Sequence, residues 1–317
     1  MKLISKVFLF ALFISLSFSC SDDDEAVIET NTIVDVAIEN NLSSLVAAVT
    51  RAELVTTLSS NGNFTVLAPT NTAFQTFLQT NGYNSVNDVP VEVLKNILMN
   101  HVITGELKST DLTTGYQKTN AISAASNTEM SIYVNVGAQV KFNGTSTVQI
   151  PNVEADNGIV HVVDAVIDLP SIVTFAVADP NFESLELALT RESDFNYVST
   201  LSTKVGTNPA PFTVFAPTND AFASLIGELS NVNSLGDIPK ATLESTLNTH
   251  VIAGFNYRAT GLSNNMTLNT LGGQLTVDLT GSVPKLVDPN SRTSDITATD
   301  VQANNGVIHA IRTVVLE

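Results

Sequence analysis

The segment Phe64-Thr-Val-Leu-Ala-Pro-Thr-Asn-Thr-Ala-Phe74 occurs a second time in the chain, as Phe212-Thr-Val-Phe-Ala-Pro-Thr-Asn-Asp-Ala-Phe222. Each copy begins with a short apolar run, which predicts a buried strand. Each run ends at a proline, and proline cannot donate to a sheet ladder, so the strand is expected to stop there.

A helix is predicted directly after each proline. Threonine and asparagine side chains accept hydrogen bonds from the free backbone N–H groups at a helix N-terminus. We therefore interpret these residues as a structural motif that turns a strand into a helix. The motif residues are Pro69, Thr70 and Asn71 in the first copy and Pro217, Thr218 and Asn219 in the second.

Two further segments are repeated in the same order along the chain. Gly158-Ile-Val-His-Val-Val163 recurs as Gly306-Val-Ile-His-Ala-Ile311, and the segment from Leu94 to Leu107 recurs from Leu243 to Asn256. Ordered internal similarity indicates duplication of one structural unit. We therefore predict two tandem domains, residues 32–170 and 171–317. Because only Pro170-Ser171 separates them, we expect their relative orientation to be restricted.

Each copy shows helical periodicity first and strand periodicity later. Apolar residues from Ile33 to Ser59 recur at helical spacing, with a break at Asn40-Asn41, and Val91 to Met99 is a second amphipathic helix that runs into a strand at His101 to Ile103. After Gly115 the apolar period becomes two, Asn143-Gly144 is typical of a hairpin turn, and the copy closes on Ile159 to Ile167. Helices followed by a β meander indicate an α+β domain.

These repeated segments resemble the signature motifs of the fasciclin domain family. The similarity covers nearly everything from Thr32 onward. It implies, for each domain, a β wedge or sandwich with helices packed on one side. It also implies extracellular roles in adhesion, matrix contact and ligand capture. Animal members use a Tyr-His pair for integrin adhesion; Asn100 and Thr249 stand at the tyrosine position here, so we transfer no adhesion residues.

The N-terminus is typical of an exported lipoprotein. Lys2 and Lys6 precede an apolar run from Val7 to Phe18, which is too short to span a membrane and predicts a signal peptide over residues 1–20. Cys20 follows a small residue and is the predicted lipidation site, through which the chain would bind a membrane. The alternative is an ordinary secretory cleavage site beside an unrelated thiol.

An acidic tether is predicted over residues 21–31. Its Ser21-Asp22-Asp23-Asp24-Glu25 run resembles the surface-export tag of some Gram-negative lipoproteins, although a merely solvated tether is the alternative. The expected location is therefore the outer membrane, with the cell surface preferred over the periplasmic face.

Composition excludes several classes of partner and site. The formal net charge of −17 repels phosphate backbones, so no nucleic acid partner is expected. Cys20 is the only cysteine, which rules out an intramolecular disulfide and any metal site that needs several cysteines.

The four histidines, which lie inside the repeated segments, are the candidates for chemistry. None has a second histidine or an acid at zinc-protease spacing, and the chain has no nucleophile elbow, phosphate loop or dinucleotide fingerprint. Strand histidines hydrogen-bonded inside the fold are the preferred interpretation, with metal binding or pH sensing as alternatives. We therefore assign no catalytic, cofactor or metal residue. These histidines are His101, His161, His250 and His309.

Two other repeated residue types have structural interpretations. Arg51 and Arg191 come late in a predicted helix, where a cation stabilises the helix dipole, although each could instead anchor an acidic ligand. Four repeated phenylalanines are predicted to lie in the core. They are Phe64, Phe74, Phe212 and Phe222.

The sequence thus favours a non-enzymatic binding or adhesion lipoprotein whose partner is a protein or glycan outside the cytoplasm. The alternative is a glycan-binding or apolar small-molecule-binding accessory protein of an envelope uptake system. Tryptophan is absent and only five tyrosines occur, which weakens the glycan alternative because sugar platforms use large aromatic faces. An enzyme is the least supported class because no catalytic constellation can be assembled.

Overall fold

The structure is a computed structural model that describes residues 31–317. The predicted signal peptide, Cys20 and the predicted tether up to residue 30 lie outside the described residues. In the part of the chain that is described, no helix combines the length and apolar character needed to cross a membrane.

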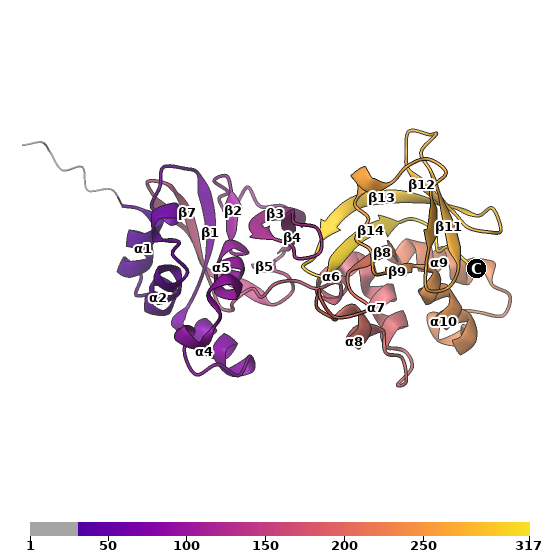
Figure 1. Cartoon of the computed structure of the whole chain (residues 1–317), viewed down its shortest axis with the longest axis horizontal. Helices are drawn as coiled ribbons and strands as arrows, with labels where there is room; N and C mark the ends of the chain where they lie inside the picture. The colour runs from indigo at the N-terminus through magenta and orange to yellow at the C-terminus, as the bar shows by residue number, and fades with distance from the viewer. Residues whose placement is uncertain (1–30) are drawn as a thin grey trace, which may run out of the picture. The chain divides into compact units, whose positions relative to one another are not determined.

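Each repeat forms an α+β domain with helices and one seven-stranded sheet (Figure 1). The first domain contains α1 (Ile33–Glu39), α2 (Ser43–Arg51), α3 (Val55–Leu58), β1 (Phe64–Pro69), α4 (Asn71–Thr80), η1 (Val86–Asp88), α5 (Val91–Met99), β2 (Val102–Thr104), β3 (Gly115–Ile122), β4 (Glu129–Val136), β5 (Val140–Phe142), β6 (Ser146–Ala155) and β7 (Gly158–Val163).

The second domain repeats this order of helices and strands and adds two short 3-10 helices, η2 and η4. It contains α6 (Ile172–Ala178), η2 (Pro180–Phe182), α7 (Glu183–Thr190), α8 (Tyr197–Leu201), β8 (Phe212–Pro217), α9 (Asn219–Glu228), η3 (Leu235–Asp237), α10 (Lys240–Thr249), β9 (Val251–Ala253), η4 (Ala259–Gly261), β10 (Thr267–Asn269), β11 (Gln274–Asp278), β12 (Lys285–Val287), β13 (Thr293–Gln302) and β14 (Gly306–Ile311).

Most of the predicted elements are confirmed. The break at Asn40-Asn41 separates α1 from α2, and Asn41 has a positive φ of 57°, which a continuing helix would not allow. Asn143-Gly144 forms the turn between β5 and β6, with both residues at positive φ. The predicted strand at His101 to Ile103 was one residue early, since β2 begins at Val102.

The strand order of the first sheet is β2-β1-β7-β6-β5-β4-β3. Strands β3 to β7 form the predicted antiparallel meander. Strand β1 then pairs parallel to β7, with Phe64 opposite Gly158, and the second sheet repeats this arrangement between β8 and β14. The approach is so close that a Cβ on Gly158 would lie 2.1 Å from the carbonyl oxygen of Phe64, so only glycine fits.

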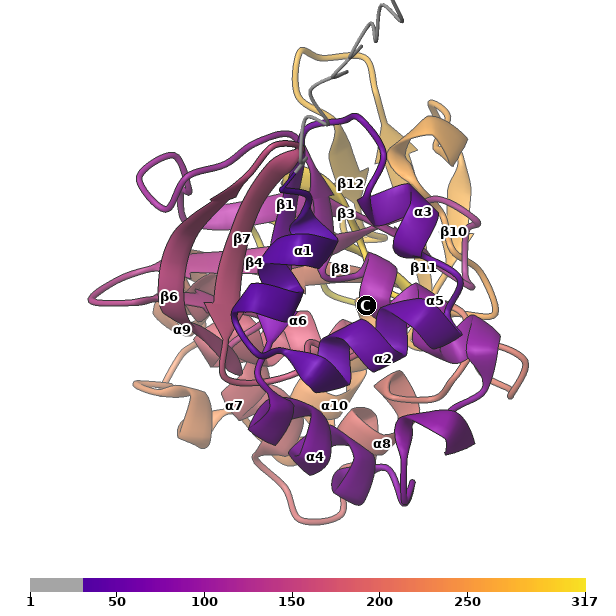
Figure 2. The same ribbon diagram turned by 90° about the vertical axis from the view of Figure 1, so that its left-hand side faces the viewer.

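Each domain has two apolar cores, one on either side of the first strand. In the first domain Val66 faces the helices and packs in a cluster with Leu45 and Leu94, while Leu67 faces the inside of the curved sheet with Ile132. Side chains alternate along a strand, so the continuous apolar run of β1 serves both cores. Figure 2 shows the layer of α1, α2 and α5 that covers β1 and β7.

The predicted core phenylalanines do not all behave alike. Phe74, Phe212 and Phe222 are at most 2% exposed and lie in the cores between helices and sheet. Phe64 is only partly buried, because it lies at the start of β1 and covers the turn at Gly62.

Candidate functional site

In both domains the repeated Pro-Thr-Asn motif connects the end of a strand to the helix that follows it and to the helices at the start of the domain. Pro69 pairs with Val163, and the following N–H group, that of Thr70, donates to the Val163 carbonyl over 3.0 Å. Thr70 is the N-cap of α4, and its Oγ1 accepts from the N–H of Ala73 at 3.2 Å. Of the two capping candidates, threonine therefore caps the helix and Asn71 begins it.

Asn71 connects α4 to the junction between α1 and α2. Its Oδ1 accepts from the N–H of Ser44 at 2.9 Å, and its Nδ2 donates to the carbonyl of Asn41 at 2.9 Å. The second domain repeats these contacts. Pro217 pairs with Ile311, Thr218 caps α9, and Asn219 binds Ser184 and Pro180 at 2.8 Å each.

His101 and His250 lie between a helix and the following strand, not within strands as predicted. Nδ1 of His101 donates to the carbonyl of Ile97 at 2.7 Å, and its Nε2 accepts from the N–H of Ile167 at 2.9 Å. His250 makes the equivalent bonds to Thr246 and Val315. Burial disfavours the charged imidazole and lowers the pKa of both histidines to about 4.

His161 and His309 lie in β7 and β14, as predicted. Nε2 of His161 donates to the carbonyl of Leu107 at 2.9 Å, and its Nδ1 accepts from the N–H of Asn152 at 3.2 Å. Nε2 of His309 donates to the carbonyl of Tyr257 at 2.8 Å, but its Nδ1 has no partner within residues 31–317. Burial lowers the pKa of both side chains.

The histidines therefore link backbone segments of their own domain through hydrogen bonds. Three of the four have both ring nitrogens bonded to main-chain atoms, which leaves neither nitrogen for proton transfer. Across the described residues, no three side chains of the metal-binding types come close enough to hold an ion.

Arg51 lies in the last turn of α2, as predicted, and Arg191 is the C-cap residue of α7, but both guanidinium groups also bind a second segment of the chain. Nη2 of Arg51 donates to the carbonyl of Val89 at 3.0 Å, and Nη1 of Arg191 donates to the carbonyls of Leu235 and Ile238. These carbonyls belong to the loop that leads into α5 or α10. The guanidinium thus fixes a loop far away in sequence, which helix periodicity alone does not reveal.

A polar seam joins the two domains. Gln302, at the end of β13, is fully buried, and its N–H donates to Oγ of Ser131 in β4 at 3.0 Å. Its Nε2 donates to Oγ of Ser123 at 3.1 Å, and that hydroxyl donates to the carbonyl of Ala303 at 2.6 Å. Close by, the N–H of Ala125 donates to the carbonyl of Asn304 at 3.1 Å.

An aromatic cluster lies beside this seam. The ring of Tyr116 packs edge-on against Tyr133 and against Phe175 of α6, at centroid distances of 5.0 and 5.5 Å. Tyr133 belongs to the first domain but is buried in the helix–sheet core of the second. Burial raises the pKa of both tyrosines, that of Tyr133 to about 12, so both hydroxyls remain protonated donors at neutral pH.

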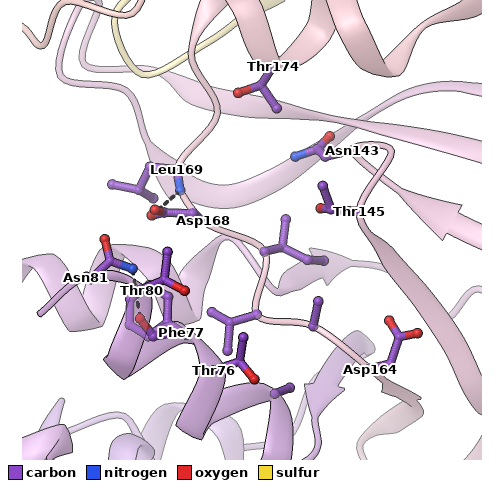
Figure 3. A pocket seen from close by; sticks show the side chains of 14 residues that line it. Thr76, Phe77, Thr80, Asn81, Asn143, Thr145, Asp164, Asp168, Leu169 and Thr174 are labelled. Carbon is purple, nitrogen blue, oxygen red and sulfur yellow. Dashed lines mark hydrogen bonds between the residues drawn. The ribbon is translucent and has the colours of Figure 1, made fainter. Parts of the chain in front are cut away.

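A pocket of about 470 Å³ lies next to the segment that connects the domains. Its walls come from α4, from the β5–β6 turn, from residues 164–169 and from α6 of the second domain (Figure 3). Phe77 and Leu169 supply apolar surface, and the exposed Asp168 also lines the pocket. A second pocket of about 320 Å³ shares Phe77, Asp168 and Leu169 and lies between the domains.

The side-chain amide of Asn143 is the unusual group in the larger pocket. Asn143 is 4% exposed, and its Oδ1 accepts from the N–H of Tyr133 at 2.8 Å. Its Nδ2 has no hydrogen-bond acceptor within residues 31–317. Figure 3 shows this nitrogen directed across the pocket toward Asp168 and Leu169. The sequence predicts Asn143 only as a turn residue, and its unpaired amide was not predicted.

Other structurally important residues were also missed by sequence reasoning. Asn157 and its counterpart Asn305 are buried and make three backbone hydrogen bonds each, and their repetition was the available signal. The roles of Tyr116 and Gln302 could not be found in this way. Each of them binds a residue of the other domain, and this contact does not occur a second time in the chain.

Comparisons with known proteins agree with this architecture. A family model described as the fasciclin domain matches residues 40–170 and 181–317. An uncharacterized protein of Synechocystis sp. is 39% identical over 136 residues, which cover 43% of this chain and 96% of that protein. Periostin of Homo sapiens is 28% identical over 274 residues, which cover 82% of this chain and 29% of periostin.

A solved structure gives the same fold. It is a FAS1 domain pair from the insect cell adhesion molecule fasciclin I, with a TM-score of 0.52 and 20% identity. The match covers 88% of this chain and 98% of that chain, so the likeness extends over both domains.

Proposed function

Because this chain belongs to the fasciclin domain family, we propose that it is a non-enzymatic binding protein that acts in adhesion outside the cytoplasm. The solved domain pair that it resembles comes from a cell adhesion molecule. The partner is a protein or a glycan, and the net charge of −17 argues against nucleic acid.

One observation carries the non-enzymatic part of this proposal. The repeated polar residues, which would be the natural candidates for catalysis, are bonded to backbone groups of their own domain. His101 is the clearest case, because both ring nitrogens are hydrogen-bonded to main-chain atoms and the residue is only 2% exposed. Because these residues stabilise the fold, we assign binding of the partner to the surface of the domain pair.

The proposal includes a lipid anchor at Cys20, in the outer membrane, with the domains on the cell surface and the periplasmic face as the alternative. The basic and apolar leader and the single cysteine behind it support this placement. Metabolic labelling with a palmitate analogue should mark the wild-type chain and not the Cys20→Ser variant. Equal labelling of both, or of neither, would remove the anchor from the proposal.

Adhesion is tested with cells that lack the chain. Deletion cells are compared with cells that produce the wild type or Cys20→Ser, in bead-binding and biofilm assays. We expect the deletion to reduce adhesion, the wild type to restore it, and Cys20→Ser to fail when the chain is released from the cell. Indistinguishable adhesion of deletion and wild-type cells would contradict the proposal.

A second candidate function is an accessory role in envelope uptake of a glycan or an apolar small molecule. The observation that favours it is the pocket beside Asp168 and Leu169, whose volume of about 470 Å³ lies in the range of small-ligand sites. Growth of deletion cells on single carbon sources tests this role, and unchanged growth on all of them would count against it.

A further inference from the structure

We propose that the pocket lined by Asn143 binds a neutral saccharide unit, with the Asn143 amide donating a hydrogen bond to one of its oxygens. This inference names a ligand class for the proposed binding function and rests on it. It is carried by the amide itself, by the charge of the pocket walls and by a difference between the two domains.

The orientation of the amide is fixed by the fold. Oδ1 of Asn143 must be the oxygen, because it accepts the N–H of Tyr133 at 2.8 Å. The NH₂ group then faces the pocket, and within residues 31–317 no acceptor lies in reach. Buried amide donors are normally paired, so an unpaired amide in the wall of a pocket indicates an oxygen-bearing ligand.

The walls select against anions. Asp164 and Asp168 line the pocket, and no lysine or arginine does. A phosphate or carboxylate ligand would therefore meet negative charge without a compensating cation. The hydroxyls of Thr76 and Thr80, on α4, can donate and accept, while Phe77 offers apolar surface. A neutral ligand with several hydroxyl groups matches these walls.

The second domain closes the equivalent place with its own side chain. There Arg292 donates from Nε to the carbonyl of Val314 at 2.8 Å and pairs through its guanidinium with Glu228, at the end of α9. In the repeat, the counterparts of Val314 and Glu228 are Val166 and Thr80, which both line the pocket of the first domain. In the second domain Arg292 thus connects the two positions whose counterparts in the first domain line the open pocket.

Binding is tested with the full chain in a zwitterionic detergent that has no sugar headgroup. The probes are the methyl glycosides of glucose, galactose, mannose, fucose and N-acetylglucosamine, with glucuronate as the charged probe. The readout is the ¹H–¹⁵N signal of the Asn143 side-chain amide, which is identified by its loss in Asn143→Asp. We expect at least one neutral glycoside to shift this signal in a saturable way.

Two matched variants locate the site. Thr76→Arg places a guanidinium in the pocket, as Arg292 does in the second domain, and Ser224→Arg makes the same change at the exposed equivalent position of α9. Thr76→Arg should weaken glycoside binding by roughly tenfold or more, and Ser224→Arg should leave it unchanged. Because both positions are exposed on helices, both variants are expected to fold.

Several results would overturn the inference. They are the absence of any shift by the neutral glycosides, a shift that survives in Thr76→Arg, a shift lost equally in Ser224→Arg, and glucuronate binding as tightly as the neutral probes. The proposed adhesion function fails separately, when deletion cells adhere normally although the purified chain binds a glycoside. Normal dependence of adhesion on the chain, without any glycoside shift, defeats only this inference.

Discussion

Oη of Tyr116, in the first domain, donates a 2.9 Å hydrogen bond to Oδ2 of Asp179, in the second. The same carboxylate accepts two hydrogen bonds from Asn181, so it is held in place from its own domain as well. Asp179 is 4% exposed. A buried carboxylate that depends on a donor from the other domain links the stability of one domain to the position of the other.

Replacement of Tyr116 by phenylalanine should loosen this link. The change removes the donor and leaves the ring packing, and we expect a loss of about 1–3 kcal/mol in the free energy of unfolding. Amide exchange at Ala125 and Gln302, whose N–H groups bond across the seam, should become faster. The control is Tyr197→Phe, which removes a hydroxyl bonded only within the second domain. Equal exchange at the seam in both variants would contradict the link.

Gln302→Ala should destabilise the chain more than most glutamine substitutions. The fully buried side chain donates to groups of both domains, and its removal leaves the Ser123 hydroxyl without one of its donors. We expect a cost of about 2–3 kcal/mol, measured by urea unfolding. The exposed Gln274→Ala is the control and should change stability by less than about 0.5 kcal/mol. A similar cost for both variants would mean that the seam contributes little.

The buried asparagines of the repeat provide a duplicate test. Asn157 donates to the carbonyls of Leu58 and Ser60 and accepts the N–H of Ile33, while Asn305 makes the same bonds in the second domain. Alanine at either position should cost about 3 kcal/mol or more, because several buried backbone groups lose their partner. Hydrogen exchange should report the release of α1 in Asn157→Ala and of α6 in Asn305→Ala. Release of the wrong helix would refute the equivalence.

Acidification should destabilise the fold through His101 and His250. Burial lowers both pKa values from 6.5 to about 4, so between these values the unfolded chain binds more protons than the native chain. Stability is therefore full above about pH 6.5 and falls as the pH drops toward 4, by about 3 kcal/mol for each histidine.

The measurement is urea unfolding at several pH values, with His101→Gln as the comparison. The variant has lost one titrating group, so its stability should depend less steeply on pH in this window. An unchanged slope would show that His101 does not titrate as its burial predicts.

The elements that occur in both copies could be predicted well from the sequence. The Pro-Thr-Asn motif, the helices and the meander repeat, and their periods of 3.6 and two are visible in the apolar residues. The parallel pairing of β1 with β7 was not predicted, because Phe64 and Gly158 are far apart and nothing local encodes their contact. The bounds of β3 were not predicted, because its burial does not alternate regularly.

The candidate site was much less predictable. Asn143 is a typical turn residue by sequence, and only the fold shows that it lines a pocket with an unpaired amide nitrogen. The hydrogen bond of Arg51 was equally unpredictable, because the carbonyl that it binds belongs to Val89 in a distant loop. The contacts across the seam occur only once in the chain. A comparison of the two sequence copies therefore does not reveal the residues that make them.

The hydrogen bonds of Tyr116 and Gln302 across the seam lead us to expect that the two fasciclin domains form one unit with a fixed relative orientation. This expectation can be checked by the distance distribution between spin labels at Glu92, on α5, and Ser224, on α9, measured by pulsed electron paramagnetic resonance in a Cys20→Ser background. A single narrow distribution that broadens when Tyr116→Phe and Gln302→Ala are combined is the predicted result. A broad distribution in the chain without these two changes would show that the domains move freely relative to each other and would refute a fixed orientation.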